Sequence, residues 1–215
     1  MNVFPPLFIP SSTLVNYVEQ CILPRYSAFD AGHDEQHVRS VIASSMLFAQ
    51  GYDVSPDMVY AIAAYHDLGL VAGRERHHLE SAIILLSDER LLEWFTEGQL
   101  RVMAQAVEDH RASAGHEPRS IYGRIVADAD HDDTPDDVIR RTLQYGLDHY
   151  PEMDEDAQVE RAIDHLKDKY GPQGYLHFWL DEARCSPNRT ATLELFDDLP
   201  ALIEKVRTML RTMRL

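Results

Sequence analysis

The chain has 215 residues, 45% of them hydrophobic, and a formal net charge of −16 at pH 7. This composition is typical of a globular protein and excludes an intrinsically disordered one, and the length fits one large domain or one domain with a tail. So acidic a surface repels phosphate backbones, so we expect no nucleic-acid duplex as a partner. A small anionic substrate is still compatible with this charge.

The cysteines and the apolar segments indicate the cellular compartment of the protein. Cys21 and Cys185 lie far apart and form no CxxC motif, so we expect no disulfide framework and a reducing environment. The first twelve residues are interrupted by prolines and have no basic start, unlike a signal peptide. No apolar run approaches the roughly 18 residues of a membrane helix. We therefore predict a cytoplasmic protein that does not enter a membrane.

Hydrophobic residues recur with helical spacing along almost the whole chain, and no segment alternates as a strand would. Ser55-Pro56 and Thr134-Pro135 each combine a capping residue with proline at the first helical position. We therefore predict an all-α fold. Its helices are expected near 12–24, 34–50, 56–69, 77–86, 88–96, 98–111, 118–131, 135–149, 154–169 and 190–213. Nearly all candidate chemistry lies in 1–150, so we predict one domain there and, in 151–215, a helical appendage packed on the same domain.

The pair His66-Asp67 ends an apolar helix and stands out among the eleven histidines. A buried histidine and carboxylate with no basic residue nearby need a counter-charge, which a metal ion can supply. His37 lies on the preceding predicted helix, one turn after His33. The segment HDEQH resembles the HExxH motif of zinc proteases, but the residue after the first histidine is Asp34. We therefore favour a different metal site.

Further candidates follow in the sequence. His78 shares a helical face with Ala82 and Leu85, which favours His78 over His77 as the inward residue. His110 ends the stripe that begins at Leu100, and acidic neighbours could orient its imidazole. Asp128 and Asp130 both fit helical spacing in RIVADADHDD, so periodicity leaves the last aspartate open.

The ordered set of His37, His66-Asp67, His78, His110 and Asp130 resembles the HD superfamily of metal-dependent phosphohydrolases. The resemblance covers roughly residues 30–135, and Asp130 is favoured there because alanine precedes it. The family pattern continues with arginine and leucine, whereas this chain has His131 and Asp132. The two additional histidines resemble the branch of the family that binds two metals. The resemblance therefore implies a helical bundle with two divalent ions per chain, iron or manganese, with magnesium, nickel or zinc as alternatives.

The same resemblance implies roles for individual residues. The six ligands would be His37, His66, Asp67, His78, His110 and Asp130, with Asp67 bridging both ions. Asp67 and His66 would support attack by an activated water, and Glu108 would act as a proton shuttle. Arginines beside the motifs could hold a substrate phosphate, although each could equally form a surface ion pair. These arginines are Arg76, Arg111, Arg119 and Arg124.

Three functions fit this pattern. The first is hydrolysis of a phosphoester or phosphoanhydride in a nucleotide or small phosphorylated metabolite. The second is a di-iron oxygenase, since the same ligand pattern serves oxygen chemistry in some relatives. The third is a metal-stabilised regulatory or sensing module without catalysis. We expect a monomer or homodimer, and the sequence does not identify the substrate.

Overall fold

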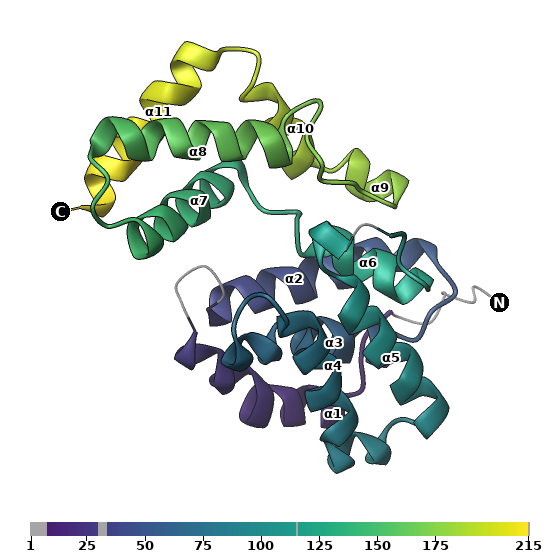
Figure 1. Cartoon of the computed structure of the whole chain (residues 1–215). Helices are drawn as coiled ribbons and strands as arrows, with labels where there is room; N and C mark the ends of the chain where they lie inside the picture. The colour runs from purple at the N-terminus through teal and green to yellow at the C-terminus, as the bar shows by residue number, and fades with distance from the viewer. Residues whose placement is uncertain (1–7, 30–33, 115, 215) are drawn as a thin grey trace. The chain divides into compact units, whose positions relative to one another are not determined.

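The computed structural model describes residues 8–29, 34–114 and 116–214, and this part of the chain consists of helices joined by turns (Figure 1). No strand occurs among these residues, which confirms the predicted all-α class. The predicted pairing of His33 with His37 lies outside the described residues.

The chain divides into two compact units, residues 1–131 and 132–215. In the described residues of the first unit, six α-helices occur with short 3-10 and π segments between them. Its α-helices are α1 (Ser12–Tyr17), α2 (Glu35–Phe48), α3 (Pro56–Tyr65), α4 (His77–Ser87), α5 (Glu97–Asp109) and α6 (Ile121–Ala129). The short segments are η1 (Val18–Ile22), η2 (Leu23–Ala28), η3 (Ala49–Gly51), η4 (Leu68–Ala72), η5 (Glu89–Glu93) and η6 (Ala112–Ala114).

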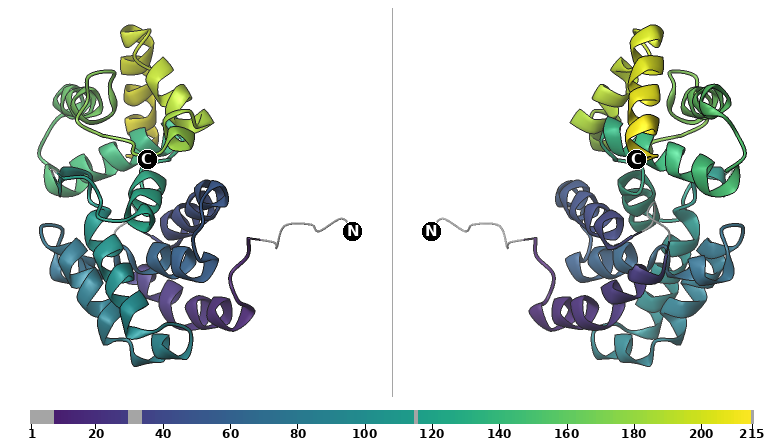
Figure 2. Two further views of the ribbon diagram at one scale, coloured as in Figure 1. Left: turned by 90° about the vertical axis from the view of Figure 1, so that its right-hand side faces the viewer. Right: turned by 90° about the vertical axis from the view of Figure 1, so that its left-hand side faces the viewer.

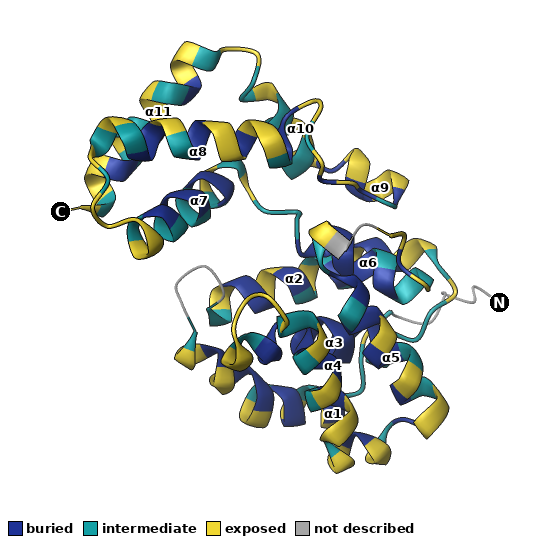
Figure 3. Cartoon of the chain, viewed as in Figure 1, coloured by how far each residue is buried: buried dark blue, intermediate teal, exposed yellow. Residues whose placement is uncertain are grey.

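Helix α3 is the centre of the first unit. Every residue from Met58 to Tyr65 is buried, and α2, α4, α5 and α6 all pack against this helix. A helix that is apolar on every side has to be covered on every side, and the dark buried positions in Figure 3 gather where these helices face one another. The packing places the C-terminal end of α3, and with it the His66-Asp67 pair, inside the bundle.

Side-chain caps fix where the central helices begin. The Ser55 hydroxyl accepts a hydrogen bond from the Met58 amide at 3.4 Å, and Pro56 follows at the first helical position. Thr96 and Gln99 form a reciprocal capping box at the start of α5. The start predicted from Ser55-Pro56 is thereby confirmed.

The second unit contains α7 (Pro135–His149), α8 (Glu155–Tyr170), α9 (Asp181–Arg184), α10 (Pro187–Glu194) and α11 (Leu199–Met213). The long helices α7, α8 and α11 pack against one another (Figure 2). The sequence placed α7 in the first domain because the boundary was expected at 150. In the structure, α7 belongs to the second unit, which begins at residue 132. Packing of the appendage on the first domain stays a prediction.

The single helix predicted over 190–213 is wrong. Two helices, α10 and α11, occupy this region. Ser186 caps α10 by accepting the Arg189 amide at 3.0 Å, and Asp198 caps α11 by accepting the Ala201 amide at 3.0 Å. Pro200 lies in the first turn of α11, where its missing amide costs no helical hydrogen bond. The caps at Ser186 and Asp198 therefore divide this region into two helices, although its hydrophobic spacing is continuous.

Across the described residues, no helix combines the length and the apolar character needed to cross a membrane.

Candidate metal centre

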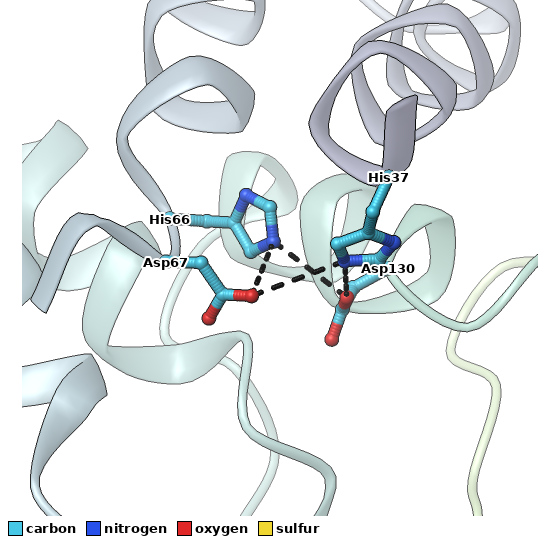
Figure 4. Close-up of side chains that lie close together, drawn as sticks. All are labelled: His37, His66, Asp67 and Asp130. Atoms are coloured by element: carbon cyan, nitrogen blue, oxygen red, sulfur yellow. Dashed lines mark ion pairs between the residues drawn. The ribbon is translucent and has the colours of Figure 1, made fainter. Parts of the chain in front are cut away.

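Four buried side chains from three helices converge inside the first unit (Figure 4). His37 lies on α2, His66 and Asp67 follow α3, and Asp130 follows α6. His37 Nε2 is 3.1 Å from Asp130 Oδ1 and 3.9 Å from Asp67 Oδ2. His66 Nε2 is 3.3 Å from Asp67 Oδ2 and 3.6 Å from Asp130 Oδ1. We call these four residues the first ligand group.

A second group shares one residue with the first. Asp67 Oδ1 lies 3.4 Å from His77 Nε2 and 3.4 Å from His110 Nε2. The two imidazole nitrogens are 3.0 Å apart. Asp67 therefore directs one carboxylate oxygen to each group. We call Asp67, His77 and His110 the second ligand group.

Helix ends explain why these residues meet. His66, His110 and Asp130 are the C-terminal capping residues of α3, α5 and α6. Unpaired carbonyls give such helix ends a partial negative charge, which favours a cation nearby. Asp34 caps α2 by accepting the His37 amide at 3.0 Å, and this places His37 in the first turn.

Backbone hydrogen bonds orient three of the imidazoles in the same way. Nδ1 of His66 lies 2.7 Å from the Ala63 carbonyl oxygen, and Nδ1 of His110 lies 2.6 Å from that of Val107. Nδ1 of His77 contacts the carbonyl three residues earlier at 2.7 Å. Because a carbonyl only accepts, each Nδ1 carries a proton and donates it. In the neutral imidazole, the lone pair is then on Nε2, which is the atom that faces the ligand groups.

The two groups differ in electrostatics. Burial lowers the pKa of His66, but Asp67 and Asp130 outweigh this effect and raise that pKa to about 10. Burial raises the pKa of Asp130, but the adjacent His131 and the two histidines of its group hold it well below the ordinary value. Burial and the neighbouring His110 lower the pKa of His77 to about 4. The first group therefore attracts positive charge, and His77 is a neutral nitrogen donor at neutral pH.

The donor set fits metal ions. Imidazole nitrogen and carboxylate oxygen bind a divalent transition metal at about 2.0–2.2 Å. Donors at that radius around one ion, in tetrahedral or octahedral arrangement, are roughly 3.0–3.5 Å apart. The measured separations of 3.0–3.9 Å in the two groups are close to this. Within the described part of the chain, buried His66 Nε2 and Asp130 Oδ1 have no hydrogen-bond partner, as expected for atoms that need an ion.

Five of the six predicted ligands lie in the two groups: His37, His66, Asp67, His110 and Asp130. Asp128, the alternative to Asp130, is also buried but belongs to neither group. Their action as ligands stays a prediction.

The structure brings His77, and not His78, to the second group, which corrects the predicted choice between them. Hydrophobic spacing favoured His78 because Ala82 is inward, but Ser81 is wholly buried too and lies one turn after His77. The Ser81 hydroxyl accepts the Gly69 amide at 2.8 Å. The inward face of α4 therefore includes a buried polar residue that a search for apolar residues misses.

Gly69 allows this arrangement. A β-carbon at position 69 would lie 2.1 Å from the His77 carbonyl oxygen and 2.4 Å from the Ser81 amide nitrogen. Only glycine therefore lets the start of α4 lie against the turn after Asp67.

The predicted catalytic and phosphate-binding residues divide into two sets. Arg119 is held by acidic side chains: its Nη2 is 2.5 Å from Glu108 Oε2, and its Nε is 3.0 Å from Asp109 Oδ1. Arg124 forms an ion pair with Glu117. Glu108, Arg119 and Arg124 thus have partners within the protein. Proton transfer by Glu108 and phosphate binding by Arg119 and Arg124 stay predictions.

The other two arginines flank the second group. Arg111 follows His110, and its Nη1 donates to the Glu75 carbonyl oxygen at 2.5 Å. Arg76 is the capping residue before α4 and is exposed. Binding of phosphate by Arg76 and Arg111 stays a prediction.

Two supporting residues were missed in the sequence. The Tyr26 hydroxyl donates to the Ala64 carbonyl oxygen at 3.0 Å and accepts the Asp67 amide at 3.4 Å, so this wholly buried tyrosine fixes the end of α3. His131 Nε2 lies 3.6 Å from Asp130 Oδ2. No sequence signal identified Tyr26. For the contact of His131 with Asp130 there was one signal: the family pattern has arginine directly after the last aspartate, whereas this chain has His131 there.

Comparison with protein families supports this site. Residues 35–134 match the family model described as HD domain, and all six residues of the two ligand groups lie in that range. The searches of curated proteins and of solved structures found no match.

Proposed function

Residues 35–134 form an HD domain, a type of domain found mostly in metal-dependent hydrolases, and on this premise we propose that the chain is a phosphohydrolase with two metal ions. The observation that carries the proposal is the position of Asp67. Its Oδ2 lies 3.3 Å from His66 Nε2, and its Oδ1 lies 3.4 Å from His110 Nε2. A carboxylate with a separate set of nitrogen donors at each oxygen is suited to bridging two ions.

The residues divide between two positions. His37, His66 and Asp130 with Asp67 Oδ2 would hold one ion, and His77 and His110 with Asp67 Oδ1 the other. Bound there, divalent ions lower the pKa of water to near neutrality and offset the charge of a phosphate. The protein orients the donors through the backbone carbonyls that fix the imidazoles. The two carboxylates supply local negative charge that retains the cations. Bound cations would in turn offset the repulsion between a phosphate and a chain of charge −16.

Exposure indicates the side from which a substrate approaches. The side chains of His66 and His110 are 0% and 2% exposed, whereas those of His77 and Asp130 are 14% and 10% exposed. Substrate would therefore reach the centre beside His77. Arg111 lies next to that group in the chain, and its guanidinium has N–H groups besides the one bound to Glu75. We assign Arg111 to a phosphate oxygen of a small substrate.

Metal content is the first test. Protein purified without added metal should contain two transition-metal ions per chain by elemental analysis, and His66→Ala should lower this content. Leu47→Ala, at an exposed leucine on α2, is the control and should retain both ions. Near-zero metal in the wild type, unchanged by His66→Ala, would contradict the site.

Turnover is the second test. The metal-loaded protein should release phosphate or pyrophosphate from members of a panel of nucleotides and sugar phosphates, and Asp67→Asn should abolish the release. Substrate-dependent oxygen uptake without phosphate release would replace the hydrolase by an oxygenase. Full metal occupancy without any turnover would favour a sensing module.

A further inference from the structure

Helix α4 presents an aliphatic side to solvent. Leu79, Ile83 and Leu86 are 37%, 53% and 49% exposed, and their spacing of four and three residues places them on one side of the helix. The only other exposed residue of α4 is Ser87. Apart from its two histidines, the helix carries one ionisable side chain, Glu80. We call Leu79, Ile83 and Leu86 the aliphatic stripe.

The opposite side of α4 packs against the rest of the first unit. Ser81, Ala82 and Leu85 are buried against the first unit, and His77 reaches the second ligand group from the same helix. Helix α4 is thus apolar both toward the core and toward solvent. A helix with that pattern is ordinarily covered on both sides, and an exposed aliphatic patch marks a contact surface.

We propose that the aliphatic stripe joins two copies of this chain in a symmetric dimer, with the two α4 helices antiparallel. The stripe repeats every three to four residues, which is the spacing of a helix–helix seam. If Leu79 faces Leu86 of the second copy, Ile83 lies beside the same residue of that copy. Every aliphatic side chain then meets another, and the contact is self-complementary, as a two-fold interface requires.

Charge at the two ends of the stripe favours a second copy over an unrelated partner. In the same register, the exposed Arg76, which directly precedes α4, comes to the end of the second copy's α4, where the exposed Glu89 follows the last helical residue by two positions. The two-fold axis repeats this pairing at the other end. Antiparallel packing also sets the positive start of one helix against the negative end of the other. The chain thus carries both halves of a complementary rim around an apolar centre.

The contact is independent of the proposed metal site. The stripe lies on the opposite side of α4 from Ser81, and His77 precedes Ser81 by one turn on the inward side. A second copy on the stripe therefore leaves the ligand groups facing their own unit. Failure of the dimer would not contradict the metal site, and failure of the metal site would not contradict the dimer.

The mass in solution tests the contact. Sedimentation equilibrium should give a dimer for the wild-type chain, and Ile83→Glu should raise the dimer dissociation constant by at least 100-fold. Leu47→Glu is the matched control, because Leu47 is 61% exposed on α2, away from the stripe. Both variants should keep the wild-type circular dichroism spectrum, since both positions are exposed. A monomeric wild type would overturn the proposal and assign the stripe to residues 132–215 or to another protein. So would a dimer that Ile83→Glu leaves intact.

Cross-linking tests the register. Cys21 and Cys185 are both exposed and free, so they are first replaced by serine. In that background, Ile83→Cys should be cross-linked between chains by a short bifunctional thiol reagent, and Leu47→Cys should not. Equal cross-linking of the two variants would overturn the register.

Charge reversal tests the rim. Arg76→Glu should weaken the dimer, and Arg76→Glu combined with Glu89→Arg should restore it. A double variant no tighter than the single one would overturn the antiparallel arrangement.

Discussion

Replacing His77 by alanine should empty one of the two proposed metal positions, whereas the same change at the adjacent His78 should leave both filled. His77 Nε2 lies 3.0 Å from His110 Nε2 and 3.4 Å from Asp67 Oδ1. His78 belongs to neither ligand group. The two substitutions remove identical side chains from consecutive residues of one helix, so each controls for the other.

The structure gives the expected magnitude. The second group has three protein donors, and His77→Ala leaves two, one of which is the carboxylate shared with the first group. Loss of a residue that merely supports a ligand weakens metal binding by about 10–100-fold. Loss of a ligand itself should weaken the second position by at least about 100-fold, or about 2.8 kcal/mol. The first position should change little, since its four donors remain.

The assay is a titration of metal-free protein with manganese, followed by the paramagnetic resonance signal of the unbound ion. Wild type and His78→Ala should bind two ions per chain, and His77→Ala should bind one tightly. If His78→Ala lost an ion and His77→Ala kept both, the assignment of the inward histidine would be refuted.

Three further predictions concern the support of the site and of the second unit. Tyr26→Phe removes the hydrogen bond to the Ala64 carbonyl and should lower the free energy of unfolding by about 1–2 kcal/mol in a urea titration; an unchanged midpoint would refute this role. Gly69→Ala forces a β-carbon against the first residue of α4 and should cost about 1–3 kcal/mol, measured in the same way; a neutral substitution would show that α4 can shift freely. Hydrogen bonds from Arg211 and Arg207 lower the pKa of Glu155 to about 2, and carboxyl NMR should show this pKa rising in Arg211→Ala. Because the pKa of Glu155 is lower in the folded state, the ion pair stabilises the fold fully above about pH 4.5, and this contribution is lost as the pH falls toward 2. A pKa of Glu155 near 4.5 in the wild type would contradict the ion pair.

Much of the fold follows from local sequence signals. The helical spacing and the caps at Ser55 and Thr134 predicted α3 and α7, because a capping side chain and a proline act within a single turn. The division of the region 190–213 was missed, because hydrophobic spacing continues across the break at Asp198. The boundary between the compact units lies at residue 131, whereas the sequence placed the domain boundary at 150. It depends on which helices pack against α7, and packing between distant segments has no local signal.

The candidate site shows the same limit. His66 and Asp67 were visible because a polar residue at the end of an apolar helix is unusual, whereas Asp130 was favoured over Asp128 only by the family resemblance. The choice between His77 and His78 depended on Ser81, a buried serine that hydrophobic spacing counts as outward. The ion-pair partners of Arg119 could not be predicted from the sequence, because a guanidinium beside a metal motif suits phosphate and carboxylate equally well.

Anomalous X-ray diffraction from crystals of the metal-loaded protein tests the central claim most directly, because it locates ions without assuming their ligands. We predict two peaks, about 3.5–4 Å apart as in other two-metal sites, with Asp67 between them, His37, His66 and Asp130 around one, and His77 and His110 around the other. A single peak, or peaks away from Asp67, would contradict the account.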